Sequence, residues 1–419
     1  MIKLLCFTGE FFPPTTGGEQ ALFNAYRLLQ NQVELHIFSL NSSDKFKDEV
    51  GLKKALPKAH ILGYNDAKRD KYSNVEAIAR KIRFLLQKLA NVTGLNKYRH
   101  LDLDIKLERN QPMLKALNQY IKEHDIDIVQ FEFMSSIYYS LGIINESVKK
   151  VFVHHELYYV VNQSRLPQNP SIDESLYYAI NKNRELSILE NYDAIITLSY
   201  EDTVRLQNEG VKTPIFTSFA QITPKGTEVK ATSEINDLAF VGPETHLPNY
   251  NGLMWFLNQV WPKILDHDPD IKLNIIGKWD KVTQNQMLER YPNLIFHGFV
   301  DNLGSAISNH VMIVPIREGS GIRMKILEAA QHFVPVVSCT VGAEGMGLTS
   351  GVNCYITDNS DNFAQHVIHL LSNIDFAKKM AQQAFDHFSE AYSDDKFIES
   401  RMACYNEVIN PEICINVES

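Results

Sequence analysis

Short apolar runs alternate with helix-length amphipathic segments along most of the chain, and this alternation limits the fold more than any other feature. The first half carries such runs from residues 2, 33, 127, 150 and 194: IKLLCF, VELHIFSL, DIVQF, KVFVHH and AIITLS. The second half carries them from residues 237, 272, 293, 311, 334 and 353: DLAFVG, KLNIIG, NLIFHGFV, VMIVPI, VPVVSC and NCYITD. Apolar strands that alternate with helices are typical of parallel sheets covered on both faces. The pattern predicts an α/β fold with two doubly wound, Rossmann-like sheets.

The boundary between the two sheets is expected near residue 223. A chain of 419 residues exceeds what one hydrophobic core usually organises. The stretch TPKGTEVKATSEIND (223–237) is polar, contains Pro and Gly and lacks apolar periodicity, as linkers do. We expect domains over 1–222 and 223–395 that face a central cleft, and a C-terminal helix in 396–419 that packs back toward the first domain. Ligands should lie outside the carboxyl ends of the strands.

Composition excludes several classes of protein. The chain is 44% hydrophobic and 22% charged, as in soluble globular proteins, and its net charge of -9 argues against nucleic-acid binding. The five cysteines are widely spaced without a Cys-x-x-Cys pair, so we expect buried thiols in a reducing cytoplasm and no metal or redox site. No apolar run has the length of a signal peptide or a spanning helix. The expected location is cytoplasmic, free or peripheral at the inner face of the membrane.

A strongly basic segment, residues 68–99, breaks the alternation. It has nine Lys or Arg against two acidic residues, Asp70 and Glu76. Its central part, SNVEAIARKIRFLLQKLA, starts with a capping-box pattern at Ser73 and carries an apolar stripe, so it predicts an amphipathic helix. Two interpretations stay open. The helix packs on the core with a solvated basic back, or its basic face meets an anionic membrane surface or a phosphate-bearing acceptor.

A Gly-Gly turn follows the first apolar run. Gly17 and Gly18 begin a helix, where small residues let the backbone approach a ligand and free N–H groups favour negative charge. The stretch is neither Gly-x-Gly-x-x-Gly nor a phosphate loop ending in Gly-Lys-Ser/Thr, so oxidoreductase and P-loop interpretations lose support. Alone, this turn is a weak signal.

Polar residues follow two of the apolar runs in the first half. His154, His155 and Glu156 lie at the end of KVFVHH, and Glu132 at the end of the run before it. Adjacent strand residues point to opposite faces, so one strand cannot offer both imidazoles to one metal ion. One imidazole that orients a hydroxyl and a purely structural histidine both remain open. Glu132 is either a site residue or a structural hydrogen-bond partner.

The most informative stretch is REGSGIRMKILEAAQHFVPVVS, residues 317–338. A glycine-rich turn connects an apolar run to a helix, and Arg323 at its start suits a pyrophosphate together with the helix N–H groups. Glu328, farther into the helix, could accept hydrogen bonds from ribose hydroxyls. An ordinary ion pair between Lys325 and Glu328, three residues apart, is the alternative.

These residues resemble the donor-binding segment of family-4 glycosyltransferases with the GT-B fold, in the subgroup with a Gly-x-Gly-x-Arg-x-Lys-x-Leu-Glu-Ala pattern. The segment is GSGIRMKILEAAQHFVPVVSCTVGAEGM, preceded by MIVPIRE. Further similar stretches follow the family's order: the Gly-Gly turn, HHE, DAIITLSYED, FVGPETHLPNYNGLMWFLNQVWPKI, LNIIGKW and IFHGFVDNL. The resemblance covers most of the chain except residues 66–112.

The resemblance implies a nucleotide-sugar donor held by the C-terminal domain. Glu328 corresponds to the glutamate that binds the donor ribose, and His155 to a catalytic histidine near the transferred sugar. The donor-binding residues it implies are Gly17, Gly18, Asn249, Lys278, Gly298, Phe299, Val300, Ser320, Gly321, Ile322, Arg323 and Lys325. Arg323 and Glu318 join His155 as catalytic candidates, and Glu132, His154 and Glu156 are candidates on the acceptor side.

Two departures from the family pattern concern charge. Ser320 stands eight residues before Glu328, where the family has the first Glu of Glu-x7-Glu, and Glu318 lies two residues out of register. In VGPETHLPNYNG, His246 and Asn249 stand where relatives carry arginine and lysine. Arg323, Lys325 and Lys278 should then provide the positive charge for the pyrophosphate.

The resemblance implies glycosyl transfer with retention of anomeric configuration, to a glycan or lipid-linked acceptor in surface polysaccharide or lipopolysaccharide assembly. No Asp-x-Asp motif lies in a convincing loop, so we expect no metal, and no cofactor beyond the nucleotide sugar as substrate. The leaving diphosphate would need stabilisation in a cleft closed to water. Alternatives are a GT-B-like binding subunit that has lost catalysis and a sugar-nucleotide epimerase.

Overall fold

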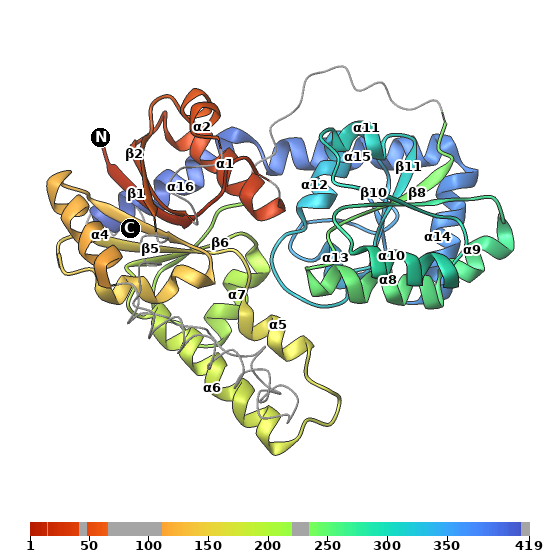
Figure 1. The fold of residues 1–419 in the computed structure, drawn as a ribbon, viewed down its shortest axis with the longest axis horizontal. Coiled ribbons are helices and arrows are strands. Elements are labelled where there is room, and N and C mark those ends of the chain that lie inside the picture. The colour runs from red at the N-terminus through yellow and green to blue at the C-terminus, as the bar shows by residue number, and fades with distance from the viewer. Residues whose placement is uncertain (15, 42–47, 66–110, 220–233, 412–419) are drawn as a thin grey trace, which may run out of the picture. The chain divides into compact units, whose positions relative to one another are not determined.

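The computed structural model describes residues 1–14, 16–41, 48–65, 111–219 and 234–411. They form two compact units, one of Met1–Ser218 with the chain from Ile398, the other of Phe219–Phe397 (Figure 1). Each unit is described by itself. The basic segment 68–99 lies outside the described residues, as does nearly all of the expected linker.

The first unit is built on a seven-stranded parallel sheet. Its strand order is β3-β2-β1-β4-β5-β6-β7. The strands are β1 (Lys3–Gly9), β2 (Glu34–Asn41), β3 (His60–Asn65), β4 (Ile128–Glu132), β5 (Lys149–His154), β6 (Ala194–Thr197) and β7 (Ile215–Thr217). All five residues of β4 are buried, as expected of a central strand covered on both faces. The predicted strands of this half are confirmed, and β3 and β7 are additional.

Helices cover both faces of this sheet. They are α1 (Gly17–Leu29), α2 (Glu49–Ala55), α4 (Gln111–Glu123), the 3₁₀ helix η4 (Met134–Gly142), α5 (Tyr158–Ser164), α6 (Ile172–Leu189), α7 (Tyr200–Asn208) and α16 (Asp394–Ile409). Thr16 caps α1 through a capping box with Glu19, so the Gly-Gly turn is the first turn of this helix. The helix is the first regular element after β1.

The second unit repeats this plan with a six-stranded parallel sheet in the order β10-β9-β8-β11-β12-β13. The strands are β8 (Asp237–Val241), β9 (Leu273–Ile276), β10 (Leu294–Gly298), β11 (His310–Val314), β12 (Val336–Ser338) and β13 (Tyr355–Ile356). The helices are α8 (Leu247–Gln259), α9 (Trp261–His267), α10 (Lys281–Arg290), α11 (Leu303–Ile307), α12 (Met324–Gln331), α13 (Thr340–Ala343), α14 (Ser360–Ser372) and α15 (Ile374–Ala391). Phe240, Phe256 and Trp261 are fully buried at its core.

Both sheets reverse their strand order at one point, and the predicted motifs follow the strands on either side of it. In the first sheet the reversal lies between β1 and β4, and in the second between β8 and β11. At such a point the connections leave in opposite directions, so a crevice opens at the carboxyl ends of the two strands. The Gly-Gly turn follows β1, and Glu132 is the last residue of β4. The glycine-rich loop, defined as residues 315–323, follows β11.

The C-terminal helix α16 starts in the second unit and continues into the first. There the Tyr405 hydroxyl donates to Oε1 of Gln130 at 2.6 Å, and the Ser400 hydroxyl donates to Ser218 at 2.8 Å. Cys6, Cys339, Cys354 and Cys404 are buried free thiols. Within the described residues, no helix combines the length and apolar character needed to cross a membrane.

Candidate active site

In the first unit, the Gly-Gly turn meets the strand-end histidine through Phe133. The Phe133 ring stacks on the His155 imidazole, with ring centroids 4.0 Å apart and an interplanar angle of 22°. A Cβ on Gly18 would lie 3.3 Å from the same phenyl ring, so a larger residue there would press on it. Phe133 has a φ of 64°, a left-handed conformation that is uncommon for a bulky side chain. We call Gly18, Glu132, Phe133 and His155 the histidine site.

A buried carboxylate orients the imidazole of the histidine site. Oε2 of Glu132 lies 2.7 Å from Nε2 of His155, and the Glu132 side chain is only 2% exposed. A carboxylate only accepts hydrogen bonds, so Nε2 of His155 carries the proton. In the neutral ring Nδ1 is then the acceptor nitrogen. Glu132 therefore contacts the candidate catalytic histidine, which favours a positioning role over direct contact with an acceptor.

Hydrogen bonds extend from Glu132 to the C-terminal helix. The Gln130 amide donates to Oε1 of Glu132 at 2.6 Å and accepts from the Tyr405 hydroxyl at 2.6 Å. Burial raises the pKa of Tyr405 well above its ordinary value, so the hydroxyl stays protonated and donates. Both Glu132 oxygens are thus held, one by Gln130 and one by His155.

The neighbouring histidine faces the other way. Nε2 of His154 lies 3.1 Å from Oε1 of Glu185 on α6, and both side chains are buried. Glu185 also accepts the backbone N–H groups of Tyr158 and Tyr159, so it caps the start of α5. The opposite orientations of the two imidazoles match the prediction from strand geometry. The burial of His154 beside Glu185 favours the structural alternative for this histidine. Glu156 lies half-buried between β5 and α5.

In the second unit, the glycine-rich loop is shaped by two glycines and an arginine. Gly319 and Gly321 have φ angles of 106° and 76°, which disfavour other residues. Nη1 of Arg323 donates to the carbonyl oxygens of Ser320 and, at 3.0 Å, of Gly321. Arg323 is 9% exposed, and its guanidinium is bound to its own loop. Arg323 precedes α12 as its N-cap rather than lying within it.

Lys325 connects the first turn of α12 to the start of α8. Nζ of Lys325 donates to Oδ1 of Asn249 at 2.8 Å and lies 5.0 Å from the centre of the Phe240 ring. Part of this side chain is exposed, but its ammonium lies against two buried residues. Burial, and secondarily the charge of Arg323, lowers the pKa of Lys325 to about 7. The contact with Asn249, rather than an ion pair with Glu328, defines the position of this lysine.

Glycines at the strand ends allow a close approach around Asn249. Its amide nitrogen donates to the carbonyl of Pro243 at 3.1 Å, and a Cβ on Gly242 would lie 2.5 Å from that nitrogen. Gly277, after β9, would place a Cβ 2.6 Å from the Gly242 carbonyl oxygen. Gly298, at the end of β10, has a φ of 69°. The three turns therefore depend on glycine.

The remaining predicted donor residues surround this region. Glu318 accepts from the Asn251 amide at 2.7 Å. Ser320 and Gly321 are buried in the loop, whereas Ile322 and Glu328 are half-buried. Gly17 begins α1 in the first unit. His246 precedes α8 as its N-cap, Lys278 is exposed after β9, and Phe299 and Val300 follow Gly298.

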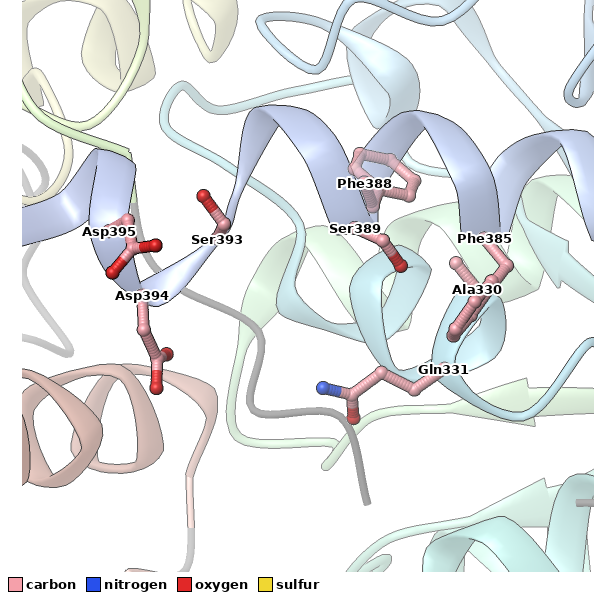
Figure 2. A pocket seen from close by; sticks show the side chains of 8 residues that line it. All are labelled: Ala330, Gln331, Phe385, Phe388, Ser389, Ser393, Asp394 and Asp395. Carbon is pink, nitrogen blue, oxygen red and sulfur yellow. The ribbon is translucent and has the colours of Figure 1, made fainter. Parts of the chain in front are cut away.

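A separate pocket of about 220 Å³ lies in the second unit, at the far end of α12. Figure 2 shows its lining from the end of α12, from α15 and from the start of α16. The residues are Ala330, Gln331, Phe385, Phe388, Ser389, Ser393, Asp394 and Asp395. None of the predicted donor residues lines it.

Several contacts of the site have no signal in the sequence. Phe133 follows Glu132 as an ordinary aromatic residue, and its stacking on His155 depends on the left-handed turn. Gln130 and Tyr405 lie 275 positions apart. Only their strand and helix assignments could have been predicted, not their contact.

Solved structures of other proteins have the same fold. Anabaena HepE in complex with UDP and glucose has a TM-score of 0.66 and 11% sequence identity, covering 97% of this chain and 100% of that chain. A TarM variant from S. aureus, in complex with fondaparinux, alpha-GlcNAc-glycerol and UDP, has the same TM-score and identity and covers 98% and 100%. At such identities the likeness establishes the fold alone, and that fold is GT-B.

Sequence comparison adds the family. Residues 235–373 match the family described as "Glycosyl transferases group 1". An uncharacterised 44.6 kDa protein in the cps region of Klebsiella pneumoniae is 26% identical over 295 residues, which are 67% of this chain and 74% of that protein. Part of the second unit therefore matches the group 1 glycosyltransferases, and the chain has the GT-B fold.

Proposed function

We propose that this glycosyltransferase moves a sugar from a nucleotide-sugar donor to a glycan or lipid-linked acceptor, in the assembly of a surface polysaccharide. Donor binding by the second unit is inferred from the contact between Lys325 and Asn249. This contact lies beside the glycine-rich loop, at the strand-order reversal of the second sheet. The relative from a cps region and the glycan complexes of the fold relatives support the acceptor class.

The diphosphate of the donor is the charge that must be stabilised. When the bond from the sugar C1 to the diphosphate oxygen breaks, negative charge grows on that oxygen. Lys325 becomes an ammonium beside it, Arg323 adds a fixed positive charge, and the N-terminus of α12 adds its helix dipole. We propose that these groups make a metal unnecessary, and that Glu328 holds the ribose hydroxyls and Gly298–Val300 the base.

The acceptor hydroxyl forms the new bond to C1 on the face that the diphosphate leaves, and its proton passes to a diphosphate oxygen. This step retains the anomeric configuration. His155, with Nε2 held by Glu132, has Nδ1 available to accept from a sugar hydroxyl. Its role is to orient the sugar at the reacting carbon.

Three measurements test this proposal. Thermal denaturation with UDP-, GDP-, dTDP- and CMP-sugars should identify one donor class, because a ligand at about 100 times its Kd stabilises by roughly 2.7 kcal/mol. UDP-sugars come first, since two fold relatives were solved with UDP. Release of nucleotide diphosphate that depends on added acceptor should follow, and NMR of the product should show retention. Binding without release would favour the inactive-subunit alternative, and an inverted product would overturn the retaining step.

A further inference from the structure

The first unit carries a second cluster of chemically active side chains, on the outer strands of its sheet. Glu34 and His36 lie on β2, two residues apart and therefore on one face. His60 begins β3 and pairs in register with His36. One face of two neighbouring strands thus presents a carboxylate and two imidazoles, and the outward ligand atoms of all three lie within 4.8 Å of one another.

The central ligand of this cluster is already oriented. The His36 side chain is 1% exposed; its Nδ1 lies 2.9 Å from the Tyr120 hydroxyl on α4, and its Nε2 lies 3.2 Å from Oε1 of Glu34. Metal-binding histidines commonly have one ring nitrogen fixed by a hydrogen bond while the other faces the ion. Tyr120 provides that fixation here.

At one end of β2 and β3 the stacked side chains are histidines, whereas farther along these strands they are Phe and Tyr. Further along the same two strands, Phe38 stacks on Tyr64 with centroids 5.8 Å apart. His36 stacks on His60 at 4.7 Å, and the ring of His124, the residue after α4, lies 5.3 Å from that of His36. Apolar rings would pack equally well here, so packing alone does not require histidines. Nitrogen lone pairs and an adjacent carboxylate add the donors that a transition metal takes.

We propose that Glu34, His36 and His60 bind a divalent transition-metal ion, with zinc the best match to two imidazoles and one carboxylate. Zinc accepts this ligand set with water in the fourth position, at about 2.0–2.2 Å from each ligand atom. Neighbouring ligands of a tetrahedral ion are then about 3.3 Å apart, close to the measured 3.2 Å between Glu34 and His36. His60, which is exposed, closes the remaining gap by turning.

Binding changes the tautomer of His36 without net loss of a proton. In the metal-free state Nε2 of His36 donates to Glu34, and Nδ1 accepts from Tyr120. When the ion binds Nε2, the single proton of the neutral ring moves by exchange with solvent to Nδ1, and the Tyr120 oxygen accepts it. The bound ion would stabilise the fold, because it ties edge strand β3 to β2. It would not take part in the histidine site: that site lies at the carboxyl ends of β4 and β5, whereas Glu34 and His60 lie at the start of their strands.

Titration calorimetry of zinc into tag-free protein, freed of metal with a chelator, tests the site. Cys414 lies outside the described residues and is replaced by serine in every sample, so that its thiol does not compete. We expect one ion per chain and a Tm rise of about 5–10 °C at roughly 100 times the Kd. His60→Ala and Glu34→Gln should each weaken binding by at least about 100-fold, and Tyr120→Phe by roughly 10-fold. His267→Ala removes an exposed histidine of the second unit and should change nothing.

Paramagnetic Co²⁺ shows where the ion binds, independently of the measured affinity. Added Co²⁺ should broaden the NMR signals of the His36 and His60 rings first. Transfer activity should be the same in His60→Ala as in the unaltered chain, because His60 has no part in the donor or histidine sites. Absence of zinc binding, equal affinity in His60→Ala, or broadening centred on other histidines would each overturn the proposal.

Discussion

Nε2 of His155 and Oε2 of Glu132 lie 2.7 Å apart at the ends of two adjacent parallel strands, β5 and β4. Burying a carboxylate costs free energy unless its oxygens are hydrogen-bonded. Here Gln130 satisfies one oxygen and His155 the other. The pair therefore fixes both the position and the tautomer of the candidate catalytic imidazole.

Glu132→Gln should reverse that tautomer. Gln130 continues to donate to the oxygen of the new amide, so the amide NH₂ group faces His155 and Nε2 must accept. The ring proton then moves to Nδ1, which can no longer accept from a sugar hydroxyl. We expect transfer to fall by roughly 10- to 100-fold, the loss of one strong hydrogen bond. Imidazole ¹⁵N shifts should report the change of tautomer.

The control for this variant is Glu146→Gln, which changes an exposed carboxylate of the same unit. It should leave the His155 ¹⁵N shifts and the transfer rate as they are. An unchanged tautomer in Glu132→Gln would contradict the positioning role of Glu132.

Tyr405→Phe should impair both stability and transfer from a position far along the chain. It leaves Oε1 of Gln130 without its buried donor, at a cost of about 1–3 kcal/mol in the free energy of unfolding. Gln130 then gains freedom to rotate, and Glu132 no longer holds His155 in one position. We expect kcat to fall while the donor KM stays the same, because the glycine-rich loop and Lys325 belong to the other unit.

Urea denaturation and steady-state kinetics measure these two effects. Tyr200→Phe, at a tyrosine that is 64% exposed, is the matched control and should be neutral. If Tyr405→Phe lowers stability but leaves kcat unchanged, the contact of Tyr405 with Gln130 has only a structural role.

Lys325 should take up a proton when the donor binds above pH 7. Its pKa of about 7 leaves the amine mostly neutral at pH 8, and a diphosphate favours the ammonium. Calorimetry of a UDP-sugar at pH 8, in buffers of different ionisation enthalpy, should show uptake of a large fraction of one proton. Lys325→Met should abolish the uptake, whereas Lys281→Met, at an exposed site, should retain it.

The same pKa has a consequence for stability without ligand. The folded pKa of Lys325 lies below its ordinary value of 10.5, so the unfolded chain binds more protons between about pH 7 and 10.5. The contribution of Lys325 to stability therefore rises with pH over that window. Lys325→Met should flatten this rise in a series of denaturation curves, and an identical slope in both proteins would contradict the assigned pKa.

Gly252→Ala should disturb the donor site through the backbone. A Cβ at this position of α8 would lie 2.4 Å from the carbonyl oxygen of Pro315, the first residue of the glycine-rich loop. The helix or the loop must move, at a cost of about 1–3 kcal/mol. We expect lower stability and weaker donor binding. Gly9→Ala, where nothing lies within 4 Å, should be close to neutral in stability.

The sequence predicted the strands because parallel strands buried on both faces must be continuously apolar. β3, with the sequence HILGYN, is an edge strand of mixed character, and β7 has three residues, so neither has that pattern. The glycine-rich loop was also predictable, because the left-handed turns at Gly319 and Gly321 require glycine.

Side-chain partners were less predictable. Glu132 had two open interpretations, and only the pairing of β4 with β5 brings it to His155. The contact of Lys325 with Asn249 joins helices 76 positions apart, whereas the alternative partner Glu328 lies on the same helix. Local spacing favours near neighbours, and tertiary packing selects distant ones. Such contacts depend on strand order, which periodicity does not encode.

We propose that the glycine-rich loop binds the donor and that the histidine site acts on the bound sugar. Equilibrium binding of the best nucleotide sugar, measured beside transfer, tests it in two variants. We predict that Arg323→Ala weakens donor binding by at least about 10-fold, while His155→Ala binds the nucleotide within a few-fold of normal but loses most transfer. Full donor affinity in Arg323→Ala, or normal transfer in His155→Ala, would contradict the account.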